Sequence, residues 1–500
     1  MAPRDLLVGE VFRTGARSAP DRVAAAAGDR SLTFAEVDRL ANQVAAELTR
    51  RGVGVSDRVV GWHGTTLDAV PLFAALAKMG AVYAPANGLL AVDEAVEMAG
   101  LARPTLIVVD DAHAADGAVV AERLGVPLAT LADLLEPGSG GGPAADEPDP
   151  DPDPAELRET DPHVVFFTSG STGRSKGVVL SNRVNVLRTH PGAQLEPRGA
   201  TVCMYPLFHM GAWTIALRAW QAQSAVVFVP PDPALLVEAV GAWRATHLNA
   251  IPAVWRRIEE HVADRPGAAA DLATLRVVDS GTSATPPDLL AAIARLAPGA
   301  VRRVFYGSTE AGAVTLLGHE DMADRPGSCG RPQHSVRVRT DPDTGELQVT
   351  GPLLFDGYFD DPEATAEAFT PDGWFRTGDV AAVDDDGFVS VVGRVKDVVK
   401  TGGETVAPAE VEAILAEHPA FADVAVVGLP DATWGEILCA VVVPAAGAPV
   451  PDVDALRTWI GDRLARFKHP RRIEIVDAIP RTAATRQVQR RLLIEEIGAR

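Results

Sequence analysis

The sequence predicts an α/β fold: a large N-terminal domain of helix-covered β-sheets with a β subdomain, and a small mobile α+β C-terminal domain. Three observations predict it. Between residues 33 and 304, short β-branched runs alternate with Ala- and Leu-rich helical patterns, which is typical of parallel sheets covered by helices. Between residues 335 and 392 the pattern changes to alternating strands with turn signals. A chain of 500 residues is also too long for one hydrophobic core.

The elements follow in order along the large domain, residues 1–395. Apolar runs predict strands, and Ala/Leu-rich segments between them predict helices; the strands are 59–62, 105–109, 164–167, 225–229 and 275–279, and the helices 67–78, 233–244 and 286–296. Residues 137–154 are almost wholly Gly, Pro, Asp, Ser and Ala, which predicts an exposed, mobile surface loop. Residues 396–500 predict the C-terminal domain, with helices at 408–417 and 453–464 and strands at 422–428, 439–444 and 471–476.

Charge and cysteine content exclude several functions. The formal charge is 46 − 67 = −21, which disfavours nucleic acid as a partner because that binding depends on neutralising phosphates. Residues 463–491 depart from this average because they contain nine Lys and Arg. This basic stretch is either a binding face for a polyanionic ligand or an ordinary solvated surface. Three separated cysteines favour a reducing cytoplasm without structural zinc. No apolar run is long enough for a signal peptide or a membrane span.

The clearest chemical motif is TSGSTGRSKGV at residues 168–178, which follows the apolar strand VVFF. Glycine and hydroxyl residues on such a turn expose backbone N–H groups and small donors that can surround a phosphate, and Lys176 adds a positive charge. The GxxxxGK[ST] spacing of a P-loop is absent. A Ser/Thr/Gly-rich surface loop is the alternative interpretation of this segment alone.

Two further motifs carry groups suited to a nucleotide. YGSTEAG at residues 306–312 follows a strand, and its Glu310 suits Mg²⁺ held together with phosphate oxygens. TGD at residues 377–379 and GRVKD at 393–397 supply Asp379 and Arg394, which could hold ribose hydroxyls or a phosphate. Each segment by itself also occurs in unrelated loops.

In their order and spacing, TSGSTGRSKG, PLFHMG, YGSTE, TGD and GRVKD resemble the adenylate-forming acyl-CoA synthetase family, over nearly the whole chain from about residue 33 to 491. The resemblance implies a two-step reaction. A carboxylate and ATP give an acyl-adenylate and pyrophosphate, and coenzyme A then displaces AMP to form a thioester. The implied cofactors are Mg²⁺, ATP or a supplied acyl-adenylate, and coenzyme A.

The resemblance also implies roles for particular residues. His209, Thr309, Glu310 and the Gln487 position are the implied catalytic residues, with Glu310 as the metal ligand. The implied nucleotide-binding residues are Thr168, Ser169, Gly170, Ser171, Thr172, Gly173, Lys176, Gly281, Thr282, Tyr306, Gly307, Ser308, Thr309, Asp379 and Arg394. Gly281 and Thr282 stand in SGTSATPP, which departs from the family's more usual SGGAPL and leaves the pocket shape open.

Lys396 corresponds to the family's hinge, about which the C-terminal domain turns between the half-reactions. A hinge needs a few residues that absorb backbone rotation. The implied thiol side comprises Gly402, Gly403, Glu404, Arg466 and Lys468.

The segment around His209 indicates the substrate class. Relatives that activate amino acids place an acidic residue here for the α-ammonium group, whereas this chain reads PLFHMGAWTIAL. We therefore expect a carboxylic acid without a free α-amine. The alternative interpretation is that His209, a histidine in an apolar stretch, is a core residue whose hydrogen bonds are satisfied within the protein.

The C-terminal motif departs from the family pattern PRTxTGKxxRR. This chain reads PRTAATRQVQRR at residues 480–491, with one extra residue, and Gln487 stands in place of the lysine that bridges carboxylate and α-phosphate. Loss of one such preorganised donor costs on the order of 10² to 10³ in rate. Adenylation is therefore expected to be impaired, unless Arg486, which replaces the glycine, takes over the role.

Three functions stay open at this point. The first is a ligase that forms thioesters from an acyl-adenylate, which a separate adenylating enzyme could supply. The second is an ordinary two-step acyl-CoA synthetase. The third is a non-catalytic protein that binds an adenylate or coenzyme A. A carrier-protein thiol in place of coenzyme A is a variant of the first two.

Overall fold

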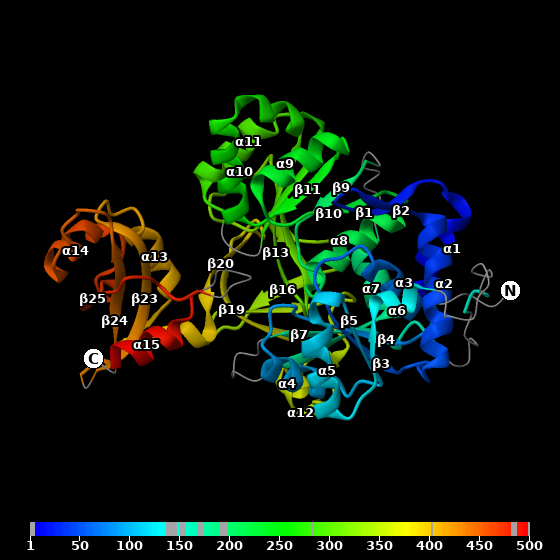
Figure 1. Ribbon diagram of the computed structural model, residues 1–500. Coiled ribbons are helices and arrows are strands. Elements are labelled where there is room, and N and C mark those ends of the chain that lie inside the picture. The colour runs from blue at the N-terminus through cyan, green and yellow to red at the C-terminus, as the bar shows by residue number, and fades with distance from the viewer. Residues whose placement is uncertain are drawn as a thin grey trace. The chain divides into compact units, whose positions relative to one another are not determined.

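A computed structural model describes residues 6–136, 148–150, 157–168, 175–190, 199–281, 285–401, 404–431, 433–481 and 488–498. The chain forms two compact units (Figure 1). Unit 1 comprises Met1–Gly327 and Gly351–Thr370, and unit 2 comprises Ser328–Thr350 and Pro371–Arg500. The domain boundary and hinge expected at Lys396 stay a prediction.

The first sheet of unit 1 is mainly parallel. Its unit 1 strands run in the order β14-β13-β12-β11-β9-β10-β1-β2, and only β14 and β2 are antiparallel to their neighbours. Figure 1 shows α9, α10 and α11 grouped beside β11 and β13. The strands are β1 (Val23–Ala27), β2 (Arg30–Thr33), β9 (Thr201–Cys203), β10 (Val226–Phe228), β11 (His247–Ala250), β12 (Val277–Gly281), β13 (Val301–Ser308) and β14 (Gly312–Gly318), and the helices are α8 (Met210–Gln221), α9 (Pro233–Ala242), α10 (Pro252–Asp264), η2 (Pro266–Thr274) and α11 (Pro287–Leu296).

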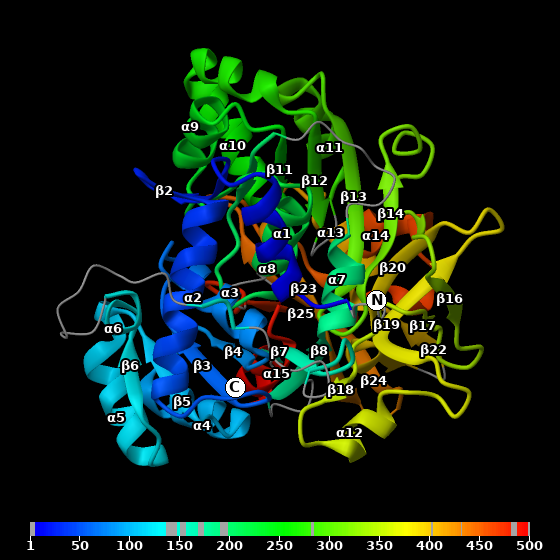
Figure 2. The ribbon, with the colours of Figure 1, turned by 90° about the vertical axis from the view of Figure 1, so that its right-hand side faces the viewer.

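The second sheet of unit 1 has the order β18-β8-β7-β4-β3-β5-β6. Figure 2 shows α4 and α5 beside the β5 end of this sheet. The strands are β3 (Arg58–Trp62), β4 (Val82–Ala86), β5 (Leu106–Val109), β6 (Leu128–Thr130), β7 (Pro162–Thr168), β8 (Lys176–Ser181) and β18 (Gly357–Tyr358). The helices are α1 (Gly9–Ser18), α2 (Phe34–Arg50), α3 (Ala69–Met79), α4 (Val92–Ala102), η1 (Asp111–His113), α5 (Ala114–Leu124), α6 (Leu131–Leu135), α7 (Asn182–Thr189) and α12 (Pro362–Glu367).

Helix α3 is buried on every side, which its apolar sequence explains. It contains one charged residue, Lys78, whose ammonium group contacts Asp38 at 2.7 Å and Asp149 at 3.0 Å. A fully buried ammonium requires such partners. Asp149 belongs to the predicted surface loop 137–154, of which the structure describes only residues 148–150.

Unit 2 contains an antiparallel sheet, β16-β17-β19-β20, and a mixed sheet, β22-β21-β24-β23, with β25 parallel to β24. The strands are β15 (Arg331–Pro332), β16 (Arg337–Thr340), β17 (Glu346–Thr350), β19 (Phe375–Val383), β20 (Val389–Arg394), β21 (Val399–Thr401), β22 (Glu404–Val406), β23 (Phe421–Asp431), β24 (Gly435–Pro444) and β25 (Arg472–Ile475). The helices are η3 (Val395–Asp397), α13 (Pro408–Leu415), α14 (Val453–Ile460), η4 (Gly461–Arg463), η5 (Arg466–Lys468) and α15 (Arg490–Gly498).

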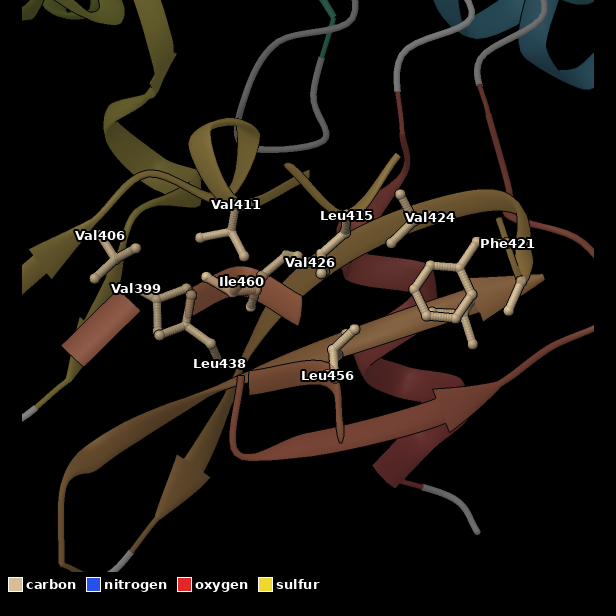
Figure 3. Close-up of a cluster of buried hydrophobic side chains, with 13 residues drawn as sticks. Val399, Val406, Val411, Leu415, Phe421, Val424, Val426, Leu438, Leu456 and Ile460 are labelled. Carbon is tan, nitrogen blue, oxygen red and sulfur yellow. The ribbon is translucent and has the colours of Figure 1, made fainter. Parts of the chain in front are cut away.

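The β23–β24 hairpin is apolar on both faces because helices cover both. Alternate residues of a strand point to opposite faces. Val424 and Val426 join a cluster that includes residues of α13 and α14, and Figure 3 shows Leu415, Leu456 and Ile460 pointing into it. Val427, on the other face, joins a cluster with residues of α15. These two layers explain the nearly continuous apolar runs of this domain.

The predicted fold class is confirmed: helix-covered sheets, a β subdomain and a small α+β C-terminal domain are all present. Among the described residues, no helix has the length and apolar character needed to cross a membrane.

Candidate active site

The predicted phosphate loop joins two paired strands. Thr168 ends β7, Lys176 begins β8, and these two residues are directly paired in the antiparallel ladder. The predicted residues between them, Ser169, Gly170, Ser171, Thr172 and Gly173, lie outside the described residues. Thr168 and Lys176 therefore mark the two ends of the predicted phosphate loop, and the Lys176 side chain is partly buried.

The second predicted motif forms the turn between β13 and β14. Tyr306, Gly307 and Ser308 end β13, and the Ser308 hydroxyl accepts a hydrogen bond from the N–H of Ala311 at 3.1 Å. A Cβ on Gly307 would stand 2.1 Å from the carbonyl oxygen of Gly312, so the hairpin requires glycine here. Thr309 and Glu310 occupy the turn itself, where the sequence placed them.

Arg188, which the sequence did not indicate, holds this turn in place. Its guanidinium group donates to the carbonyl oxygens of Thr309 at 2.8 Å, Glu310 at 2.6 Å and Leu353 at 2.7 Å. It also lies 3.4 Å from the sulfur of Met210, the residue after His209. Burial lowers the pKa of Arg188 to about 10, so the side chain stays charged at neutral pH. An arginine in the last turn of a short helix carries no sequence signal for this role.

Tyr358 is a second residue that the sequence did not indicate. Its hydroxyl donates to Oε1 of Glu310 at 3.2 Å, and Nζ of Lys176 lies 4.7 Å from the centre of its ring. Burial raises the pKa of the Tyr358 phenol, which keeps the hydroxyl protonated as a donor. The structure thus brings Lys176 and Glu310, predicted from separate motifs, to one tyrosine.

His209 immediately precedes α8. Its side chain is partly buried and its ring lies 4.5 Å from that of Phe208. Burial lowers the pKa of His209, so the imidazole is neutral at pH 7. Gly281 ends β12, and a Cβ there would approach the ring of Phe305 to 2.6 Å. Thr282 lies outside the described residues.

The predicted ribose ligands meet in unit 2. Asp379 on β19 and Arg394 on β20 are directly opposite each other in the ladder, with Nε of Arg394 2.8 Å from Oδ1 of Asp379. Asp379 is buried, at 7% exposure, so this ion pair fixes the orientation of its carboxylate. The sequence predicted both residues but not that each would be the other's partner.

The predicted thiol-side residues are also in unit 2. Glu404 begins β22, whereas Gly402 and Gly403 lie outside the described residues. Arg466 is exposed, and Nζ of Lys468 contacts Oε1 of Glu410 at 2.6 Å. Lys468 therefore already has an anionic partner.

An exposed aromatic residue lies beside this region and was missed by the sequence. Trp434 is 40% exposed, and the guanidinium carbon of Arg471 lies 3.9 Å from its ring centre. The next residue, Gly435, pairs with Thr401, the last residue before the two undescribed glycines. A cation stacked on an exposed indole is a surface that can contact a phosphorylated, planar group.

The implied hinge and C-terminal loop lie in unit 2 as well. Lys396 is exposed in η3. Arg486 and Gln487 lie outside the described residues, but their segment is flanked by a bridge between Arg481 and Val488. Arg490, at the start of α15, contacts Glu412 at 2.6 Å and Asp397, the residue after Lys396, at 3.4 Å.

The donor set in unit 1 fits Mg²⁺ brought with a nucleotide. Mg²⁺ prefers oxygen ligands and in nucleotide sites uses one or two carboxylates, phosphate oxygens and water. Glu310 supplies one carboxylate, and Thr309, its neighbour in the sequence, carries a hydroxyl group. In the described part of the chain, no group of three or more His, Cys, Asp and Glu side chains could hold a metal without such help.

Comparison with known proteins identifies the family. Residues 12–359 match the AMP-binding enzyme family and residues 410–486 match the AMP-binding enzyme C-terminal domain. Feruloyl-CoA synthase from Amycolatopsis sp. is 34% identical over 94% of this chain and 95% of its own length, and 4-coumarate–CoA ligase 2 from Oryza sativa subsp. japonica is 31% identical over 95% and 89%.

A solved structure agrees with these relatives. ATP-bound MatB from Rhodopseudomonas palustris superimposes with a TM-score of 0.84 at 28% identity, covering 98% of both chains. The match extends over both units. The site residues Lys176, Glu310 and Tyr358 of unit 1 fall inside residues 12–359, which match the AMP-binding enzyme family. The chain therefore belongs to the AMP-binding enzyme family, the adenylate-forming superfamily, as an AMP-forming acid–thiol ligase of the acyl-CoA synthetase type.

Proposed function

We propose that this ligase joins a carboxylic acid without an α-amine to coenzyme A through an acyl-adenylate. The observation that carries the proposal is the arrangement in which Lys176, Tyr358 and Glu310 bring a cation and a carboxylate together at the ends of two predicted phosphate-binding turns. This set suits a magnesium nucleotide, because the cation neutralises phosphate and the carboxylate holds the metal. When bound, Mg²⁺ would neutralise charge on the phosphates.

An aryl-substituted acid is the first substrate class to test. The relatives at 34%, 31% and 31% identity are named feruloyl-CoA synthase, 4-coumarate–CoA ligase and indoleacetate–CoA ligase. The segment around His209 is apolar, and the neutral imidazole places no cation or anion beside the acid. A flat apolar acyl group fits such surroundings better than a zwitterionic amino acid.

The chemistry assigns each half-reaction to described groups. In the first, a carboxylate oxygen bonds to the α-phosphorus and pyrophosphate leaves, while Lys176 neutralises the phosphates and the Asp379 carboxylate accepts from ribose hydroxyls. In the second, the thiolate sulfur bonds to the acyl carbon and AMP leaves. Trp434 and Arg471 offer a planar and cationic surface for the nucleotide end of coenzyme A.

We further propose that adenylation is the slower step. Gln487 replaces the lysine of the C-terminal family motif, and a neutral amide cannot stabilise the charge that develops at the α-phosphate. Arg486 is the alternative cation, although a guanidinium fork and an ammonium are not interchangeable in a tight site. If adenylation is fully lost, an adenylating partner enzyme would have to supply the acyl-adenylate.

Rotation about Lys396 belongs to the same proposal. Residues 396–500 would present the 482–487 segment during adenylation and the Gly402–Gly403 segment during thioester formation. The contacts of Arg490 with Asp397 and Glu412 support movement of the C-terminal segment together with the chain just after the hinge.

A panel of acids tests the function. Aryl, aliphatic and amino acids would each be supplied with ATP, Mg²⁺ and coenzyme A, and again as synthetic acyl-adenylates with coenzyme A alone. We expect thioesters from aryl acids in the second format at least. Glu310→Gln should lower the rate, whereas Glu320→Gln, an exposed carboxylate near the same hairpin, should not. Reaction of amino acids only, or of no acid in either format, would contradict the proposal.

A further inference from the structure

We propose that Tyr358 is a positioning residue that keeps Lys176 and Glu310 apart, so that the ammonium stays available to phosphate and the carboxylate to a metal cation. The inference rests on the proposed nucleotide-binding function of Lys176 and Glu310. It adds a residue that neither the motifs nor the family matches assign.

The position of Tyr358 follows from strand pairing. β18 pairs with β8, and Tyr358 stands directly opposite Val178. Lys176 lies two residues before Val178 on the same strand, so its side chain points to the same face and is a diagonal neighbour of Tyr358. This explains why the ammonium lies 4.7 Å from the ring centre, within the range of a cation–π contact.

Glu310 is held on the other side of Tyr358. Its carbonyl oxygen accepts from the N–H of Phe355 at 2.8 Å, which ties the β13–β14 turn to the segment that leads into β18. Its carboxylate then accepts from the Tyr358 hydroxyl at 3.2 Å. The tyrosine thus contacts the cation with its ring and the anion with its hydroxyl.

Without this residue the two charges would be expected to pair. Both side chains are partly buried, where opposite charges attract more strongly than in water. In the described part of the chain, Lys176 and Glu310 make no ion pair with each other. A direct pair would neutralise the cation that phosphate needs and occupy the carboxylate that the metal needs.

Two substitutions separate the functions of the ring and the hydroxyl. Tyr358→Phe keeps the ring and removes the hydroxyl, whereas Tyr358→Leu removes both. Tyr83→Phe is the matched control, because it deletes another buried hydroxyl of unit 1, which is 2.8 Å from Nε2 of His63. The melting temperature of each variant identifies any that fails to fold.

The readout is ATP affinity by calorimetry, without acid, so that no turnover occurs. In EDTA, we expect Tyr358→Leu to bind ATP about tenfold more weakly than the wild type, Tyr358→Phe to fall between them, and Tyr83→Phe to equal the wild type. Titration of Mg²⁺ in the presence of ATP should show a higher half-saturating concentration for Tyr358→Leu.

A double variant makes the test specific. Adding Glu310→Gln to Tyr358→Leu removes the anion that would capture Lys176, so ATP affinity in EDTA should return to within about threefold of the wild type. A tyrosine that only supports the fold would give no such recovery. Unchanged ATP affinity in Tyr358→Leu, or no recovery in the double variant, would overturn the inference but leave the proposed function standing. Failure of the wild type to bind ATP in either condition would overturn both.

Discussion

Replacement of Arg188 by methionine removes the guanidinium that holds the Thr309–Glu310 turn. Three hydrogen bonds to carbonyl oxygens are lost, at 2.6 to 2.8 Å. A hydrogen bond to a charged group contributes about 1.5 to 3 kcal/mol, so three give at least about 4.5 kcal/mol. Because the side chain is partly exposed, water recovers some of this. We expect the free energy of unfolding to fall by about 3 kcal/mol.

The same change should impair catalysis. Two of the three carbonyls that Arg188 holds belong to Thr309 and Glu310, so the side chains of these two residues lose a fixed direction. We expect kcat/KM for thioester formation from acyl-adenylate and coenzyme A to fall about 100-fold, because small displacements in a reacting site have effects of this size. Arg188→Lys, which keeps the charge but not the fork, should lie between the two.

Arg183→Met is the matched control for this prediction. Arg183 is on the same helix but is exposed, and its guanidinium is 3.7 Å from Glu159. Its loss should change the free energy of unfolding by less than about 0.5 kcal/mol. Urea unfolding and steady-state kinetics give both quantities. Equal effects at the two arginines, or a stable Arg188→Met protein with wild-type kinetics, would refute the reasoning.

Three other predictions follow from the site and the core. Gln487→Lys, with the extra residue of its segment deleted, should raise ATP–pyrophosphate exchange at least about tenfold; no increase would show that Gln487 does not limit adenylation. Lys396→Pro should fix φ and trap one domain arrangement, so overall turnover should drop while one half-reaction persists, and unchanged turnover would exclude this hinge. Burial lowers the pKa of His163 to about 3. Between that value and about 6.5, the ordinary pKa of histidine, only the unfolded chain binds the proton, so the free energy of unfolding should decrease as the pH is lowered. We expect it to be about 2 kcal/mol smaller at pH 5 than at neutral pH. Chemical denaturation should show that this pH dependence is absent in His163→Gln.

The sequence predicted those parts of the fold that depend on local periodicity. The parallel sheets of unit 1 and the α+β segment after Lys396 follow from apolar runs and helical patterns. The apolar run at 422–428 predicted a strand, which the structure contains as part of β23. The grouping of Ser328–Thr350 with the C-terminal residues could not be predicted, because it depends on contacts between segments distant in sequence.

The candidate site was predictable where its residues stand in motifs. Lys176, Glu310, Asp379 and Arg394 were all named from the sequence, and the structure places the first two at one tyrosine and the last two in one ion pair. Their roles as ligands stay predictions.

The sequence did not predict residues whose contacts depend on strand pairing and helix packing. Arg188 lies over 120 residues from the turn that it holds, and Tyr358 reaches Glu310 only because β18 pairs with β8. Both contacts arise from strand pairing and helix packing, not from any local pattern. Trp434 was missed for the same reason, since only the pairing of the next residue, Gly435, with Thr401 brings it beside β21.

The ratio of the two half-reaction rates in the unmodified protein tests the central claim most directly. ATP–pyrophosphate exchange measures adenylation, and release of AMP from a synthetic acyl-adenylate with coenzyme A measures thioester formation. We predict that thioester formation exceeds exchange by at least about 100-fold, the effect of one missing cationic donor. Exchange as fast as thioester formation would contradict the claim and make Arg486 the next residue to replace, and no AMP release from any acyl-adenylate would contradict the proposed ligase function itself.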